Sequence, residues 1–293
     1  MNPEQWYLTE DLDEFLARAG DFLHSRPALH TVPLTVTHAL RRRGLHVYGP
    51  EAPLFGLLYG GDGADPIRAV LLHTPPFPVH VTPLAQDGTD ALVARLADLD
   101  RPVPGISATR ETAAAFAAAW QRRTGPAGTV GPRQQQRLYR LEELTHPEPG
   151  PEGRARIADS TDRELLARWY VAFHEAVGAR HAQDPAEWAD ARLAHAGVTL
   201  WETADGTPVS MAGTTPQVAG QVRLAPVYTP AELRGRGYAG AVTAEASRAA
   251  REAGAAEVVL FTDLANPTSN GLYRRIGYRP VADFAVWEFD DRT

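Results

Sequence analysis

The sequence predicts an α/β (α+β) fold in which a mixed, mostly antiparallel sheet is flanked by helices, repeated in two tandem copies. Three observations support this prediction. Segments with the apolar period of helices alternate with short runs rich in β-branched residues. Proline, glycine and charge are densest over residues 145–156, which is typical of a linker between domains. The order of predicted elements is similar on both sides of this linker, although no repeat is visible residue by residue.

In the second half, the first helix is predicted from a capping box, with Thr161 as N-cap and Glu164 three residues later. The runs VTLWE, PVSMAGTTP and GQVRLAPVY are separated by turn signals and predict an antiparallel meander. The run EVVLFT has the composition of a buried central strand. The remaining predicted elements are helices over 185–195, 239–253 and 269–276 and strands near YRPV and AVWEF.

The first half is predicted to follow the same plan. Its predicted helices lie near residues 10–23, 35–43, 89–99 and 111–122, and its predicted strands are PLFGLLY, IRAVLLH and VHVTPL. The segment that joins the last of these strands to its helix, PLAQDGTDA, has no loop that combines arginine with several glycines. We therefore expect one domain over residues 1–148 that lacks a phosphate-binding loop and a second domain over 153–293 that carries one.

Composition excludes several chemistries before any motif is considered. Cysteine is absent, and all 29 basic residues are arginine, so thiolate metal sites, cysteine nucleophiles, a P-loop lysine and lysine Schiff bases are excluded. The formal net charge of -7 argues against general nucleic-acid binding, which needs a basic surface. No apolar run approaches the length of a membrane span, and the N-terminal segment is acidic. We expect a soluble, cytoplasmic protein without membrane partners.

The stretch GRGYAG contains Gly235, Gly237 and Gly240 and fits the dinucleotide-binding pattern G-x-G-x-x-G. Asp263 stands near the position of the carboxylate that binds ribose in such folds. A nicotinamide site is nevertheless disfavoured, because residues 229–234 separate the glycines from the preceding strand, whereas a Rossmann loop follows its strand almost immediately.

The loop has the chemistry of an anion site. Glycine at positions 235 and 237 lets the backbone approach a ligand closely, and the loop leads into a helix whose free N–H groups attract anions. Arg234 and Arg236 add positive charge beside it. These features suit a pyrophosphate. The alternative is an arginine-rich turn that only caps the helix.

Two motifs together resemble the GNAT superfamily of N-acetyltransferases, over roughly residues 154–289. The first is the acyl-CoA-binding pattern R/Q-x-x-G-x-G/A, which matches Arg234, Gly237 and Ala239. The second is N-x-x-A-x-x-x-Y-x-x-x-G, with serine in the alanine position, which matches Asn266, Ser269, Tyr273 and Gly277. The predicted element order is also similar to that of the family. The first half resembles the family only in element order, as in tandem proteins in which one copy has lost its CoA site.

The resemblance implies an acetyl-CoA site in the second domain. The N–H groups between Arg236 and Gly240 would bind the pyrophosphate. The backbone of Val227 and Tyr228 would pair with the pantetheine arm and direct an N–H group at the thioester carbonyl, where it would stabilise the oxyanion. The residues implied in acyl-CoA binding are Val227, Tyr228, Arg234, Gly235, Arg236, Gly237, Tyr238, Ala239, Gly240, Asn266, Ser269 and Tyr273.

Tyr273 is the predicted catalytic residue, because the departing thiolate needs a proton that a tyrosine hydroxyl can supply. The alternative for Tyr273 is an aromatic side chain that packs under the sheet. Asn266 would hydrogen-bond the pantetheine arm, or cap a helix before Pro267, and the two roles are compatible. Glu175 and His174, on the first helix of the second domain, are candidate bases for the attacking amine, against the alternative of a solvated helix face.

Other enzyme classes lack their signatures. His174 and Glu175 begin the pattern H-E-x-x-H, but Gly178 stands where the second histidine belongs, so no metal site is expected. The sequence has no G-x-S-x-G motif, which leaves a serine hydrolase without its nucleophile signature.

The sequence therefore predicts an N-acetyltransferase that moves an acetyl group from acetyl-CoA to a primary amine by direct attack in a ternary complex. One alternative is a module that binds or senses acyl-CoA without catalysis. Another is the same fold with a different acyl donor, such as an aminoacyl-tRNA. The acceptor stays open between small-molecule and peptide or protein amines, and so does the oligomeric state.

Overall fold

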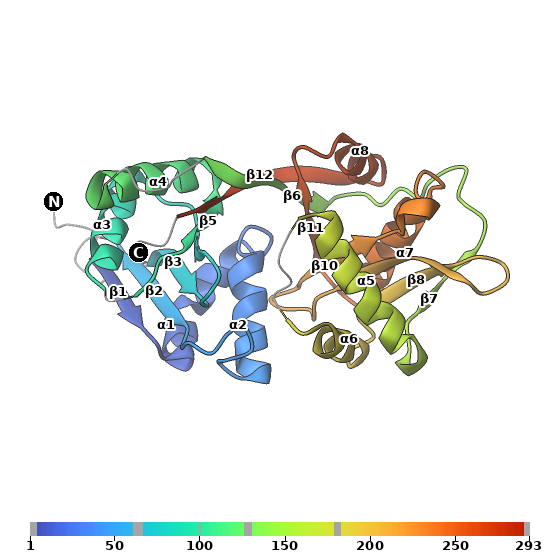
Figure 1. Cartoon of the computed structure of the whole chain (residues 1–293), viewed down its shortest axis with the longest axis horizontal. Helices are drawn as coiled ribbons and strands as arrows, with labels where there is room; N and C mark the ends of the chain where they lie inside the picture. The colour runs from blue at the N-terminus through green and yellow to red at the C-terminus, as the bar shows by residue number, and fades with distance from the viewer. Residues whose placement is uncertain (1–4, 61–66, 100, 126–130, 179–182, 290–293) are drawn as a thin grey trace. The chain divides into compact units, whose positions relative to one another are not determined.

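The computed structural model describes residues 5–60, 67–99, 101–125, 131–178 and 183–289 (Figure 1). The chain divides into two compact units. Unit 1 comprises Met1–Arg137, Asp263–Ala265 and Ala282–Thr293, and unit 2 comprises Leu138–Thr262 and Asn266–Val281. The predicted domains 1–148 and 153–293 are continuous in sequence. In the structure the chain passes from unit 1 to unit 2 within β6 (Pro132–Leu141), enters unit 1 briefly at Asp263–Ala265, and passes to unit 1 again within β12 (Tyr278–Glu288).

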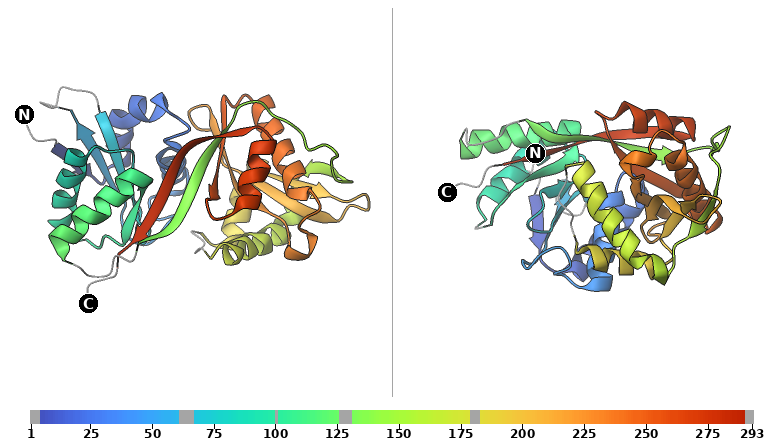
Figure 2. Two further views of the ribbon diagram at one scale, coloured as in Figure 1. Left: turned by 90° about the horizontal axis from the view of Figure 1, so that it is seen from above. Right: turned by 45° about the vertical axis from the view of Figure 1, so that its right-hand side comes forward.

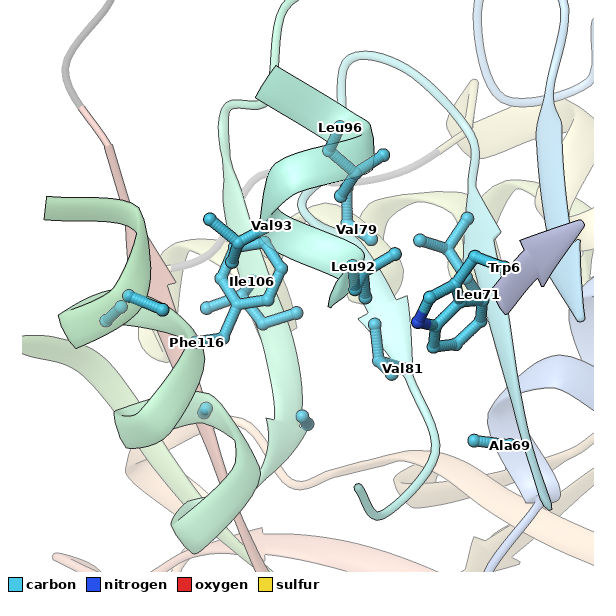
Figure 3. Close-up of a cluster of buried hydrophobic side chains, with 14 of the residues drawn as sticks. Trp6, Ala69, Leu71, Val79, Val81, Leu92, Val93, Leu96, Ile106 and Phe116 are labelled. Carbon is cyan, nitrogen blue, oxygen red and sulfur yellow. The ribbon is translucent and has the colours of Figure 1, made fainter. Parts of the chain in front are cut away.

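Unit 1 contains a sheet in the order β1-β2-β3-β4-β5-β12. Its elements other than β12 are β1 (Gln5–Thr9), α1 (Leu12–Ser25), α2 (Thr31–Arg43), β2 (Leu54–Tyr59), β3 (Ile67–His73), β4 (Val79–Val81), α3 (Gln86–Ala97), β5 (Gly105–Thr109) and α4 (Arg110–Thr124). Helix α1 covers one face, where Phe15 stacks on Phe55 with ring centroids 4.9 Å apart. Figure 3 shows side chains of α3 and α4, such as Leu92 and Phe116, beside strand residues such as Ile106 on the other face.

Unit 2 contains a sheet in the order β6-β11-β10-β9-β8-β7. Its elements other than β6 are β7 (Arg154–Ile157), α5 (Arg163–Ala176), α6 (Pro185–Leu193), β8 (Val198–Glu202), β9 (Pro208–Thr214), β10 (Gln221–Tyr228), α7 (Tyr238–Glu252), β11 (Glu257–Asp263) and α8 (Pro267–Arg275). Helices α5 and α6 pack with Leu200 in one buried cluster, and α7 and α8 pack with Leu224 in another. In the left view of Figure 2, α5 and α7 lie on opposite sides of the strands.

The same order of ten helices and strands occurs twice among the described residues, disregarding two short 3₁₀ helices. It is β-α-α-β-β-β-α-β-α-β, from β1 to β6 and from β7 to β12. In each run, the fourth and fifth strands are parallel and joined by a helix, as β4-α3-β5 and β10-α7-β11. The predicted repetition of one plan is therefore present, and the VTLWE, PVSMAGTTP and GQVRLAPVY strands form the antiparallel meander predicted for them.

Some predicted elements differ from the structure. Thr161 is not an N-cap: the carboxylate of Asp159, two residues earlier, accepts hydrogen bonds from both the N–H and the hydroxyl of Thr161, and α5 begins at Arg163. A carboxylate is a stronger acceptor at this position than a hydroxyl. The runs YRPV and AVWEF belong to one continuous strand, β12. None of the described helices combines the length and the apolar composition that a bilayer span requires.

A buried ion cluster fixes β7, the edge strand of unit 2. The guanidinium of Arg156 donates to both carboxylate oxygens of Asp162, at 2.5 and 2.7 Å, and also binds Glu202. The carboxyl side chains are only 7% and 6% exposed. The hydrogen bonds from Arg156 lower the pKa of Asp162, and burial opposes them less strongly. The folded state therefore favours the ionised carboxylate.

We expect Asp162→Asn to lower the free energy of unfolding by about 2–3 kcal/mol at pH 7, because it leaves a half-buried guanidinium without its main partner. The pKa of Asp162 is lower in the folded than in the unfolded chain, so its contribution is present above the unfolded value and is lost as the pH falls through the folded value. Urea unfolding should therefore show the difference shrinking below about pH 4. Asp190→Asn, which removes the half-exposed Arg163–Asp190 pair, is the control with a smaller effect, and equal losses would contradict the prediction.

Candidate functional site

The site is organised by strand β10, which pairs with β9 and β11 in its first half and with β9 alone in its second half. From Gln221 to Leu224 it pairs with β11 in parallel, with Leu224 opposite Leu260. The register with β9 shifts between Leu224 and Val227, and the strand then continues along β9, with Val227 opposite Ala212. In the described chain, the pairing between β10 and β11 ends at Leu224, so the two strands separate beyond that residue.

The bulge in β10 has specific supports that the sequence motifs did not reveal. Arg192, at the end of α6, donates hydrogen bonds to the carbonyl of Thr214 at 2.7 Å and, more weakly, to that of Ala225 at 3.5 Å. His195 Nε2 also faces the Thr214 carbonyl, at 3.1 Å. A Cβ atom on Gly213 would come within 2.9 Å of the Ala225 carbonyl oxygen, so the close approach of β9 to the bulge requires glycine.

The glycine loop leads into α7 in the way that the sequence predicts. Gly235 and Gly237 have φ of 78° and 86°, in the left-handed region that favours glycine. Helix α7 begins at Tyr238, and its first intrahelical bond runs from the Ala241 N–H to the Gly237 carbonyl. The preceding N–H groups of the first turn have no intrahelical acceptor, and together with the helix dipole they favour an anion.

The two arginines of the loop have exposed side chains that are anchored to its backbone. Arg234 Nε donates to the Thr229 carbonyl at 3.1 Å, and Arg236 Nη2 donates to the Glu232 carbonyl at 3.2 Å. A guanidinium has five N–H groups, so each anchor leaves donors for an anion. The first turn of α7 also packs closely on α8, because a Cβ atom on Gly240 would lie 3.0 Å from Leu272 Cδ1.

Asn266 is the N-cap of α8. Its side-chain oxygen accepts a hydrogen bond from the Ser269 N–H at 3.0 Å. Its carbonyl accepts one from the side-chain amide of Asn270 at 2.7 Å, and Asn270 in turn accepts from the Tyr139 hydroxyl at 2.9 Å. The capping role predicted for Asn266 is therefore present, and its side-chain amide group retains donors for a ligand.

Tyr273 lies in a cluster of tyrosines. Its ring is 6.5 Å from that of Tyr139 and 6.1 Å from that of Tyr278, and the residue is 7% exposed. Burial raises the pKa of Tyr273 to about 12. Within the described residues the Tyr273 hydroxyl forms no hydrogen bond, whereas the Tyr278 hydroxyl is paired with Ser247 Oγ at 2.7 Å. Tyr273 therefore packs against other aromatic rings beneath the sheet, and its protonated hydroxyl has no protein partner among the described residues.

The candidate bases occupy the last turn of α5. His174 Nδ1 donates to the Tyr170 carbonyl at 2.8 Å, and its ring contacts those of Tyr170 and Phe173. Glu175 is exposed and has no hydrogen-bond or ion-pair partner among the residues that the structure describes. On the same helix, Trp169 contacts the ring of Tyr228, with centroids 5.9 Å apart, so α5 reaches the end of β10. Across the described part of the chain, no three histidine, aspartate or glutamate side chains form a metal-binding group.

The corresponding place in unit 1 is built differently. Helix α3 follows the parallel strand β4, as α7 follows β10, but Ala85 is its N-cap and Asp87 lies in its first turn. The Gly88 carbonyl accepts a hydrogen bond from Trp6 Nε1 at 3.0 Å. The N–H of Leu84 donates to Thr112 Oγ1 at 3.0 Å. The start of α3 therefore carries a negative charge, whereas the start of α7 is preceded by arginines and left-handed glycines.

Residues 163–278 match the model of the acetyltransferase (GNAT) family. The matched segment runs from α5 to the first residue of β12 and contains the glycine loop, Asn266 and Tyr273. This part of the chain is therefore a GNAT-family domain, as its two motifs predicted. A comparison with curated proteins gives no significant match.

Solved structures share the fold over the whole chain. The GCN5-related N-acetyltransferase from Sphaerobacter thermophilus has a TM-score of 0.60 at 18% identity, with 98% of this chain and 95% of that chain covered. An acetyltransferase of the GNAT family from Colwellia psychrerythraea has a TM-score of 0.58 at 11% identity, with 98% and 100% covered. A tandem GNAT protein from the clavulanic acid biosynthesis pathway has a TM-score of 0.56 at 13% identity, with 99% and 100% covered. At such identities the similarity shows the fold alone.

We expect the Tyr273 hydroxyl to keep its proton well above the pH at which an ordinary tyrosine, with a pKa of about 10, loses it. The ¹³Cζ resonance of Tyr273, assigned by its loss in Tyr273→Phe, should titrate with a midpoint near pH 12. Circular dichroism over the same range would confirm that the chain stays folded. A midpoint near pH 10 in the folded protein would contradict the burial of this hydroxyl.

Proposed function

We propose that unit 2 is an acyl-CoA-dependent N-acyltransferase that transfers an acetyl group from acetyl-CoA to a primary amine. One observation carries the proposal. A single GNAT-family domain combines strands that separate beyond Leu224 with a left-handed glycine turn that opens α7. The separated strands offer backbone groups to an extended pantetheine arm, and the helix start offers N–H groups to a pyrophosphate.

Different residues of the chain would bind different parts of acetyl-CoA. N–H groups of the turn from Gly235 to Gly240 bind the pyrophosphate, and Arg234 and Arg236 neutralise its charge. The backbone at Val227 and Tyr228 binds the pantetheine arm and directs an N–H group at the thioester carbonyl, where negative charge develops during the attack. Asn266 donates from its side-chain amide to the same arm. Ser269 and Tyr238 lie beside these groups on α8 and α7.

Acetyl-CoA supplies the activated acetyl group as a thioester. In direct attack, a bond forms between the amine nitrogen and the carbonyl carbon, and the carbon–sulfur bond breaks. Tyr273, whose hydroxyl is protonated at neutral pH, donates its proton toward the sulfur, where negative charge develops as the carbon–sulfur bond breaks. Glu175, through water, is the group that we propose to accept the proton lost by the amine. The first copy is proposed to bind no acyl-CoA, because the equivalent helix start has Asp87 in its first turn and is not preceded by left-handed glycines or arginines.

The transferase is tested by thiol release from acetyl-CoA in the presence of a panel of amines: a polyamine, an aminoglycoside, a peptide with a free N-terminus and a lysine peptide. The chain has no cysteine, so a thiol-reactive dye reports only the released CoA, and no lysine, so its own side chains provide no acceptor. We expect release that depends on one class of amine. A raised melting temperature without release would favour the acyl-CoA-binding module, and the absence of both would favour another donor, for which charged tRNA is the next substrate to try.

We expect Tyr273→Phe to lower kcat about 10²-fold or more with the best amine, while KM for acetyl-CoA changes little, because only the proton donor is lost. Tyr278→Phe is the matched control. It removes the hydroxyl that binds Ser247, so it should lower the free energy of unfolding by about 1 kcal/mol and leave kcat unchanged. Undiminished turnover in Tyr273→Phe would rule out the proton-donor role.

A further inference from the structure

The segment between β6 and β7, residues 142–153, connects the two runs of elements and contains the sequence PEPGPEG. Its composition predicts a flexible linker. The structure instead anchors it to unit 2 at both ends. The N–H groups of Glu142 and Thr145 donate to the carbonyls of Gly277 and Ile276, each at 3.1 Å. The carbonyl of Glu152 accepts from Trp201 Nε1, also at 3.1 Å.

The middle of this segment lies along the start of α7. Pro147 Cγ is 3.3 Å from the position that a Cβ atom on Gly240 would take, and the ring of Pro151 is 3.6–3.7 Å from that position on Gly237. His146 Nε2 lies 3.3 Å from a carboxylate oxygen of Glu245, two turns into the same helix. Two proline rings and one polar contact therefore fix the segment against the glycine turn and the helix that follows it.

The contact matters because the turn is intrinsically adaptable. Glycine at 235 and 237 provides the left-handed conformation but also the largest conformational freedom of any residue. N–H groups bind an anion well only if they already point at it, since ordering them on binding reduces the affinity. A proline ring, whose own backbone is rigid, restricts such a turn by contact.

We propose that Pro147 and Pro151 of the connecting segment are positioning residues for the pyrophosphate of acyl-CoA, acting through the Gly237–Gly240 turn that they contact. The inference rests on the proposed function. Their removal should weaken binding of the nucleotide part of the donor and leave the chemistry at the thioester unchanged, because neither ring lies among the residues proposed to act there.

The test compares two donors in the full chain. Acetyl-CoA has the pyrophosphate, whereas S-acetylpantetheine has the same thioester and arm without it. In Pro147→Ala/Pro151→Ala we expect kcat/KM with acetyl-CoA to fall about tenfold, because KM rises while kcat stays the same. With S-acetylpantetheine we expect kcat/KM to change less than about twofold. The Kd of CoA, measured by calorimetry, should rise by a similar factor. Pro147→Val/Pro151→Val, which keeps the bulk of both side chains, should recover most of the loss.

Pro50→Ala is the matched control, because Pro50 is an exposed proline of unit 1 and undergoes the same chemical change. The inference is overturned if the double variant retains the wild-type Kd for CoA, or if both donors lose activity equally, which would indicate general damage. If the double variant does not fold, each single variant gives the same comparison. A wild-type chain that shows no preference for acetyl-CoA over S-acetylpantetheine would instead contradict the proposed function itself.

Discussion

Strand β10 pairs with both neighbours only as far as Leu224, and the rest of the candidate site depends on this constraint. A strand inside a sheet normally satisfies its backbone groups on two sides. Here the bulge turns β10 along β9, so the side toward β11 is left for another partner. The glycine turn and α7 follow within ten residues of Tyr228, so the start of α7 lies close in sequence to the place where the strands separate.

The features that the sequence predicted are those with a local cause. The left-handed glycines, the helix that follows them and the spacing from Asn266 to Tyr273 are each set by a few neighbouring residues. The supports of the bulge were not predictable in this way. Arg192 and its carbonyl acceptor in Thr214 are far apart in sequence, and nothing in their local pattern indicates that they meet.

Strand β6 was not predicted from the sequence, and the division into two units also depends on contacts between residues that are distant in sequence. Strand β6, PRQQQRLYRL, is mostly polar because only its last residues are buried, so it lacks the apolar alternation that predicts a strand. The segment with linker composition lies between the two runs of elements, whereas the chain passes between the compact units at β6, β11 and β12. The end of β6 belongs to unit 2 and the end of β12 to unit 1. The strand next to which each end lies, such as β5 beside β12, is decided by register between distant segments rather than by local sequence.

The two copies differ most at the helix that follows the fourth strand. In unit 1 the start of α3 bears Asp87 in its first turn, and this negative charge disfavours an anionic ligand there. In unit 2 the start of α7 carries glycines and arginines, which suit a ligand but leave the turn weakly determined by its own residues. The prolines that contact this turn lie in the segment that joins the copies. The second run of elements therefore has a connecting segment against its glycine turn, and the proposed restraint of that turn comes from the segment rather than from the residues of the turn itself.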